Sequence, residues 1–142
     1  MKTLVVHCHP NPDSFNAALY RAAVGALRTA GHELRCIDLY AEGFDPVLTR
    51  EEREAYLPNP GLIEARVQPH VDALKWAEQL VFVYPTWFYG PPAMLKGWLE
   101  RVWLPGVAFL PPPAKGKPAV PGLRHIRRRC HPTLVAVLRQ VQ

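Results

Sequence analysis

Short apolar runs alternate with segments of helical periodicity along the first two thirds of the chain. Three of these runs are short, apolar and bounded by turn residues, which predicts β-strands. They are Lys2–His7, Glu33–Leu39 and Gln79–Tyr84. Strands that alternate with helices are typical of a parallel sheet joined by crossover helices. The pattern therefore predicts an α/β domain, and no internal repeat interrupts it.

The first helix is predicted directly after the first strand and its loop. Ser14 is a credible N-cap, with Asp13 nearly as good, and Gly31 closes the helix as a C-cap. Apolar residues recur at helical spacing between these two ends. They are Phe15, Ala18, Leu19, Ala22, Ala23, Ala26 and Leu27.

Three more helical segments are predicted further along the chain. Thr49 and Glu52 have the spacing of a capping box, at the start of a short helix over residues 49–56. A crossover helix with Pro69 near its start presents one apolar face, formed by Val67, Val71 and Leu74. A helix over Pro92–Trp103 buries Met94, Leu95, Trp98, Leu99 and Val102. Lys96 and Arg101 on that last helix are expected to be surface or interface charges.

Composition divides the chain near residue 105. Residues 1–109 carry 10 basic and 12 acidic side chains, whereas residues 110–142 carry 7 basic and no acidic ones. Seven of the 16 prolines lie between Pro105 and Pro132. The expected domains are a globular unit over residues 1–110 and a Pro-rich basic tail over residues 111–142. Within the tail, residues 115–122 are expected to form a loop, and residues 133–141 one strand or a short helix.

The overall composition excludes several classes of protein. Nearly half of the 142 residues are apolar, which is typical of a globular domain, and no apolar run reaches the roughly 18 residues of a membrane span. The basic run at residues 124–129 is short and lacks interleaved aromatics, so a solvated edge is favoured over a nucleic-acid site. Three cysteines without metal spacing predict free thiols, with Cys8 and Cys36 buried, and a reducing cytoplasm.

The loop after the first strand leads into the start of a helix. Such a loop presents free backbone N–H groups and the positive end of the helix dipole, which favours a phosphate. Ser14 and Asn16 can add side-chain donors, and His9 a charge-assisted one. The spacing of glycines typical of dinucleotide-binding loops is absent. A plain capped turn is the alternative interpretation.

The loop after the third strand is rich in aromatic side chains. It runs Pro85-Thr86-Trp87-Phe88-Tyr89-Gly90 and opens the last helix. Aromatic residues at this end of a strand in a doubly wound sheet favour a ligand cleft, although covering the sheet edge or an interface is the alternative. Gly90 is expected to allow close approach of the backbone. With strand order 2-1-3, the two loops are neighbours at the topological switch point. One suits a phosphate and the other a planar ring, which together point to a flavin nucleotide.

Four motifs of the chain occur together in one known family. They are His9-Pro10, Asp13-Ser14-Phe15-Asn16, Tyr84-Pro85 and the ungapped segment 90–102. Through them, residues 1–110 resemble the flavodoxin-like NAD(P)H:quinone oxidoreductase family. The resemblance implies a three-layer α/β sandwich with a parallel sheet of order 2-1-3-4-5. It also implies that His9, Phe15 and Asn16 hold the phosphate end of FAD or FMN. Thr86, Trp87, Phe88 and Tyr89 would contact its isoalloxazine ring.

The function implied by the resemblance is hydride transfer from NAD(P)H through the flavin to a quinone, in a homodimer. The family's fourth-strand loop, fifth strand and last helix are not readable after residue 122, so a truncated end with the tail as a remnant of the strand-four region is expected. No catalytic acid or base is assigned for that reason. The alternatives are a flavin-binding regulatory protein, such as an ancillary subunit of a potassium-efflux system, and an inactive truncated homologue.

Overall fold

The fold is built around a parallel sheet with helices on both faces. The structure is a computed structural model that describes residues 1–112, 117–123, 125–126 and 136–138. Its main sheet has the strand order β2-β1-β3-β6. These strands are β1 (Lys2–His7), β2 (Glu33–Asp38), β3 (Gln79–Pro85) and β6 (Ala136–Leu138). All three pairings are parallel, and β1 is in register with β2 from Lys2↔Glu33 to His7↔Asp38. The predicted order 2-1-3 is confirmed.

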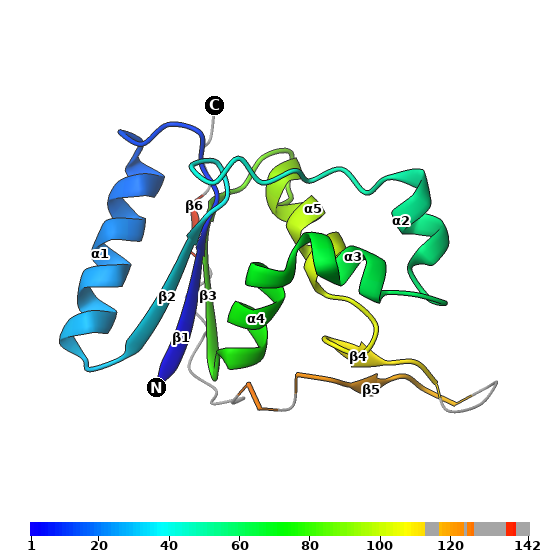
Figure 1. Cartoon of the computed structure of the whole chain (residues 1–142). Helices are drawn as coiled ribbons and strands as arrows, with labels where there is room; N and C mark the ends of the chain where they lie inside the picture. The colour runs from blue at the N-terminus through cyan, green and yellow to red at the C-terminus, as the bar shows by residue number, and fades with distance from the viewer. Residues whose placement is uncertain (113–116, 124, 127–135, 139–142) are drawn as a thin grey trace.

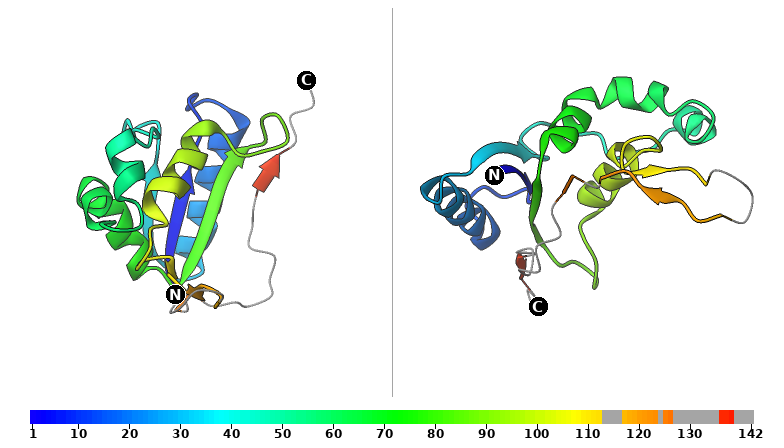
Figure 2. Two further views of the ribbon diagram at one scale, coloured as in Figure 1. Left: turned by 90° about the vertical axis from the view of Figure 1, so that its right-hand side faces the viewer. Right: turned by 90° about the horizontal axis from the view of Figure 1, so that it is seen from below.

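The helices divide between the two faces of this sheet, as Figures 1 and 2 show. Helix α1 (Phe15–Thr29) lies on one face, and α4 (Gln68–Trp76) and α5 (Ala93–Val102) lie on the other. The short helices α2 (Arg50–Ala55) and α3 (Gly61–Arg66) lie beside α4 and α5. The three layers match the expected α/β sandwich. No helix among the described residues is long and apolar enough to cross a membrane.

Two apolar clusters hold the layers together. The larger one joins the sheet to α4 and α5 and includes Leu4, Leu74 and Trp98, all fully buried. The smaller one lies under α1 and consists of Val5, Val24, Val81 and Val83. Alternate residues of β1 therefore serve opposite faces, as the two-residue period of a strand requires.

Local signals in the sequence locate most element ends correctly. The Ser14 hydroxyl oxygen accepts from the Ala17 N–H at 3.1 Å, and Gly31 adopts φ 76 just after the end of α1. The Thr49–Glu52 capping box is present at the start of α2. The predicted buried face of α1 is partly wrong, however, because Phe15, Ala18, Ala22 and Ala26 are exposed. The helix instead buries Asn16, Ala17 and Val24 and packs Tyr20 against the sheet.

Three elements lie outside the sequence prediction. Helix α3 lies in a stretch for which the sequence pattern predicts no element. Strands β4 (Phe109–Leu110) and β5 (Val120–Pro121) pair antiparallel, so the expected loop over residues 115–122 is wrong at its last residues. Strand β6 lies within the expected strand or short helix at residues 133–141, and it pairs with β3 from Val83↔Ala136 to Pro85↔Leu138. The other residues of that segment lie outside the described part of the chain.

Two predicted environments are wrong. Cys8 is buried as expected, but Cys36 is exposed because β2 is an edge strand. Arg101 was expected to be a surface or interface charge, yet it is buried within the fold and its guanidinium donates to Glu52 Oε1 at 2.5 Å. Cys130 lies outside the described residues.

Helix α5 packs against the segment before α2 through a glycine. A Cβ added at Gly97 would lie 2.2 Å from the carbonyl oxygen of Pro46. We expect Gly97→Ala to destabilise the fold by about 1–3 kcal/mol, because this contact is with backbone and cannot move aside cheaply. Denaturant unfolding followed by circular dichroism measures the change.

Gly25→Ala on α1 is the matched control for Gly97→Ala. Nothing lies within 4 Å of a Cβ at Gly25, so the same change there should stabilise the helix by about 0.5–1 kcal/mol. Equal effects of the two substitutions would contradict the close packing of α5 at Gly97.

Candidate functional site

Two loops meet at the carboxyl edge of the sheet. The β1–α1 loop contains residues 8–14, and the β3–α5 loop contains residues 86–92. The backbone N–H of Cys8 donates to the carbonyl of Val83 at 3.0 Å, which holds the end of β1 against β3. The rings of His9 and Trp87 then lie 6.0 Å apart between centroids, tilted by 58°. The two loops singled out in the sequence are therefore neighbours at this edge.

The β1–α1 loop is a compact turn that leads into the start of α1. The Asn11 N–H donates to His9 Nδ1 at 3.0 Å, and Asn11 Oδ1 accepts from the Asp13 N–H at 2.8 Å. Ser14 is used as the helix cap, so its hydroxyl oxygen is committed to the Ala17 N–H. These contacts orient the loop and leave the backbone N–H groups of Phe15 and Asn16 in the first turn for an anion.

Asn16 is the polar residue of α1 that is turned inward at this edge. Its side chain is only 5% exposed, and neither its Oδ1 nor its Nδ2 has a hydrogen-bond partner within the described part of the chain. The Thr86 hydroxyl, on the facing loop, is also buried without a partner there. An unpaired buried polar group costs about 1–3 kcal/mol. Such groups call for an explanation, and a bound polar molecule is one.

The β3–α5 loop contains a two-residue turn with aromatic residues at both central positions. Trp87 and Gly90 exchange two backbone hydrogen bonds of 3.0 Å each, while Phe88 and Tyr89 adopt φ values of 46° and 63°. Turns of this kind usually contain Asn or Gly, and a strained non-glycine residue costs on the order of 1–3 kcal/mol. Phe88 and Tyr89 are 102% and 95% exposed. The positive φ values of this turn therefore fall on two aromatic residues and not on Gly90.

The other predicted site residues occupy the same edge. Pro85 is buried at the end of β3, and Phe15 is an exposed apolar side chain at the start of α1. Cys8 is fully buried, and this burial raises the pKa of its thiol to about 12. A hydrogen bond with the Leu95 backbone lowers the pKa, and the negative charge of Asp38 raises it, but both effects are smaller than that of burial. The Cys8 thiol therefore stays protonated at neutral pH and supplies no nucleophile.

A histidine–carboxylate pair beneath this edge was missed in the sequence. His7 Nδ1 lies 2.9 Å from Asp38 Oδ2, the His7 ring stacks on Tyr20 at 4.6 Å, and His7 Nε2 is buried without a partner among the described residues. The sequence contained one sign of this position. Alternate residues of β1 face the same side of the sheet, so His7 lies on the α1 face together with Val5. The partner Asp38 becomes visible only when β1 and β2 pair.

A comparison with known protein families shows to which of them this chain belongs. The sequence profile described as "Flavodoxin-like fold" matches residues 1–126. This chain belongs to that family. Among its curated relatives, the NAD(P)H dehydrogenase (quinone) 1 of Cavia porcellus is 34% identical over 123 residues, which cover 76% of this chain and 45% of the relative. The ribosyldihydronicotinamide dehydrogenase (quinone) of Pongo abelii is 33% identical over 124 residues, covering 76% of this chain and 53% of the relative.

A solved structure extends this comparison to the fold. The NAD(P)H:quinone oxidoreductase from Methanothermobacter marburgensis aligns with a TM-score of 0.71 and 32% identity, covering 77% of this chain and 56% of that protein. The family member described here spans about half the length of the curated relatives that it matches.

Proposed function

We propose that this chain binds a flavin nucleotide, FAD or FMN, between the β1–α1 and β3–α5 loops. We further propose that the protein uses it to pass electrons from NAD(P)H to a quinone. The observation that carries the proposal is the pair of buried, unpaired polar side chains, Asn16 and Thr86, on two loops whose His9 and Trp87 rings are 6.0 Å apart. The names of the relatives support the electron donor and acceptor.

The start of α1 supplies the groups for the phosphate end. The N–H groups of Phe15 and Asn16 and the positive end of the helix dipole favour an anion there. The Asn16 amide would donate to a phosphate oxygen or a ribitol hydroxyl and so lose the cost of its unpaired burial. His9, whose ring lies 6.0 Å from that of Trp87, would add a charge-assisted donor.

The β3–α5 loop supplies the platform for the ring end. The Thr86 hydroxyl and the backbone around Trp87 would hydrogen-bond the polar edge of a flat heterocycle, while the aromatic side chains exclude water from it. When bound, the flavin supplies two-electron hydride chemistry, and the chain positions it and shields it. Phe88 and Tyr89 are exposed enough to cover a flat acceptor or a second copy in a homodimer.

A second candidate is a flavin-binding protein without turnover. Such a protein would hold the cofactor between the β1–α1 and β3–α5 loops without passing electrons on to an acceptor. The free thiols of Cys8 and Cys36 favour a reducing cytoplasm for either candidate.

Reconstitution separates these candidates. The purified chain is mixed with FMN or with FAD, and the absorbance and fluorescence of the flavin are followed before NADH or NADPH and a soluble quinone are added. We expect quenched flavin fluorescence and quinone-dependent oxidation of the nicotinamide. Quenching without oxidation favours the binding protein, and no change with either flavin rejects both candidates.

A further inference from the structure

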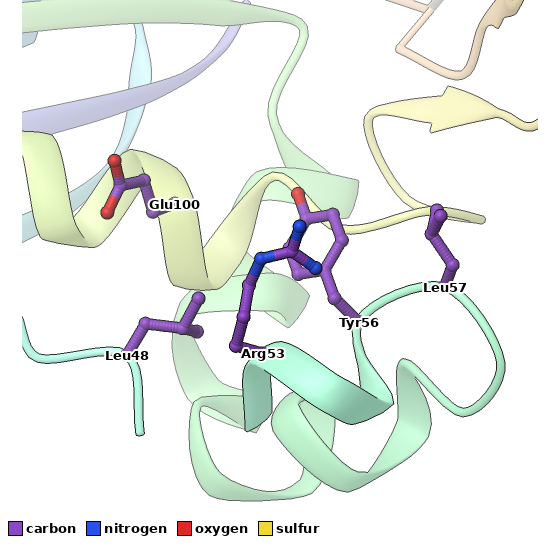
Figure 3. A pocket seen from close by; sticks show the side chains of 5 residues that line it. All are labelled: Leu48, Arg53, Tyr56, Leu57 and Glu100. Carbon is purple, nitrogen blue, oxygen red and sulfur yellow. The ribbon is translucent and has the colours of Figure 1, made fainter. Parts of the chain in front are cut away.

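A cavity lies away from the carboxyl edge of the sheet. It has a volume of about 520 Å³ and is lined by Leu48, Arg53, Tyr56, Leu57 and Glu100. Figure 3 shows that Arg53, Tyr56 and Leu57 belong to α2 and the residues just after it, whereas Glu100 comes from α5. This volume is within the range of small-molecule sites, roughly 300–1,000 Å³.

Arg53 brings an unpaired positive charge into this cavity. Its neighbours on the same side of the molecule are paired: Arg50 contacts Glu54 at 2.8 Å, and Arg66 contacts Glu51 at 2.7 Å. No carboxylate lies within 4.0 Å of the Arg53 guanidinium among the described residues, and no hydrogen bond of its side chain is present there. The guanidinium is thus free to accept an anionic partner.

The acidic residue of the cavity does not cancel that charge. Glu100 forms an ion pair with Lys96, one turn earlier on α5. The remaining side chains are apolar: Leu48 is half-buried, Leu57 is exposed, and the ring of Tyr56 lies between α2 and α5. The Tyr56 hydroxyl donates to the carbonyl of Trp103 at 3.2 Å, which holds the ring in place. Burial raises the pKa of Tyr56, and the negative charge of Glu100 adds to the rise, so the phenol stays neutral at pH 7.

We propose that this cavity binds small amphipathic carboxylates. The carboxylate would pair with the Arg53 guanidinium in a bidentate contact, which is the geometry that arginine favours. The aromatic or branched apolar body of the ligand would cover Leu48, Leu57 and the Tyr56 ring. This cavity is independent of the proposed flavin site, because the two share no residues.

Phenylacetate is the probe that tests this site, titrated into the isotope-labelled full chain and followed by amide chemical shifts. We expect saturable shifts around α2 and α5 with a Kd on the order of 1 mM, as the size of so small a ligand allows. Arg53→Gln should weaken binding by about tenfold or more, since it removes the charge-assisted pair. Arg50→Gln on the same helix should leave the affinity unchanged.

Phenylacetamide and FMN complete the experiment. The neutral amide should bind at least about tenfold more weakly than the acid. Bound FMN should leave the phenylacetate affinity unchanged, so that this site and the flavin proposal fail or succeed separately. Equal affinity of acid and amide, or no loss in Arg53→Gln, overturns the proposal. It is also overturned if phenylacetate binding vanishes as the protein concentration rises, because a second copy then fills the cavity.

Discussion

Replacing Glu52 with alanine is expected to lower the free energy of unfolding by about 3–5 kcal/mol. The Glu52 carboxylate is 0% exposed and accepts from Arg101 at 2.5 Å and from the Thr49 N–H at 2.8 Å, while Arg66 lies 3.3 Å away. Its loss would leave the buried Arg101 guanidinium with only the exposed carboxylate of Asp45, 3.7 Å away. It would also remove one half of the capping box of α2. Because whole domains are stable by only about 5–15 kcal/mol, this is a large fraction of the total. Urea unfolding at neutral pH measures it.

Controls separate the buried pair from the general loss of a charge. Glu54→Ala on the same helix removes an exposed partner of Arg50 and should change stability little. Glu52→Gln keeps the shape of the side chain but removes its charge, so this variant should also be less stable than the wild type. Wild-type stability at both Glu52 variants would contradict the importance of the buried pair.

The same carboxylate predicts sensitivity to acid. Burial raises the pKa of Glu52. The hydrogen bonds from the Thr49 N–H and the Arg101 guanidinium lower it by more, so the net pKa is below the ordinary value. A carboxylate with a lowered folded-state pKa contributes stability above its unfolded-state pKa of about 4.3 and loses it as the pH falls through the folded-state value. The difference in stability between the wild type and Glu52→Gln should therefore shrink below about pH 4.

Asn16→Leu is expected to weaken flavin binding by roughly 10- to 100-fold without destabilising the free protein. The Asn16 amide is buried with both polar atoms unpaired in the described part of the chain, so an apolar side chain of similar size removes an unfavourable burial from the free state. In the bound state the same change removes the donor and acceptor that the flavin would use. Fluorescence titration with FMN and FAD measures the affinity, and thermal unfolding measures the stability.

The loss of affinity without a loss of stability makes this test specific. A variant that merely damages the fold would lose both affinity and stability. Asn59→Leu, a change at an exposed amide outside the site, is the matched control and should preserve the affinity. If Asn16→Leu binds flavin as the wild type does, the phosphate end of the cofactor lies elsewhere.

Much of the fold could be predicted from local patterns. Strands β1, β2 and β3, helix α4 and the caps at Ser14 and Thr49 depend on a few neighbouring residues, so their signals are present in any short window of the chain. The buried face of α1 could not be read in the same way. Alanine is tolerated both inside and outside, so the row of alanines on α1 does not indicate which side meets the sheet, and Asn16 and Val24 turned out to be buried.

The candidate site was predictable in outline for a related reason. Parallel strands that are neighbours end at the same edge, so the loops after β1 and β3 had to meet once the strand order was right. The aromatic loop and the helix start were visible as residue types. The strained conformation of Phe88 and Tyr89 was not visible, because glycine rather than an aromatic residue is the usual sign of a positive φ.

Residue types and their spacing were thus sufficient to predict the order of strands and helices and the edge at which the two loops meet. Both follow from short-range periodicity and chain topology. Residue types and spacing did not predict which side chains pair with the buried charges. Arg101 and Glu52 are 49 positions apart and look like ordinary surface residues, and His7 and Asp38 are separated by a helix. Such pairs arise when packing removes water from groups that are distant along the chain. A buried charge without a partner is energetically unfavourable, so the folded structure pairs these groups. The order of residue types along the chain does not show which groups will be buried together.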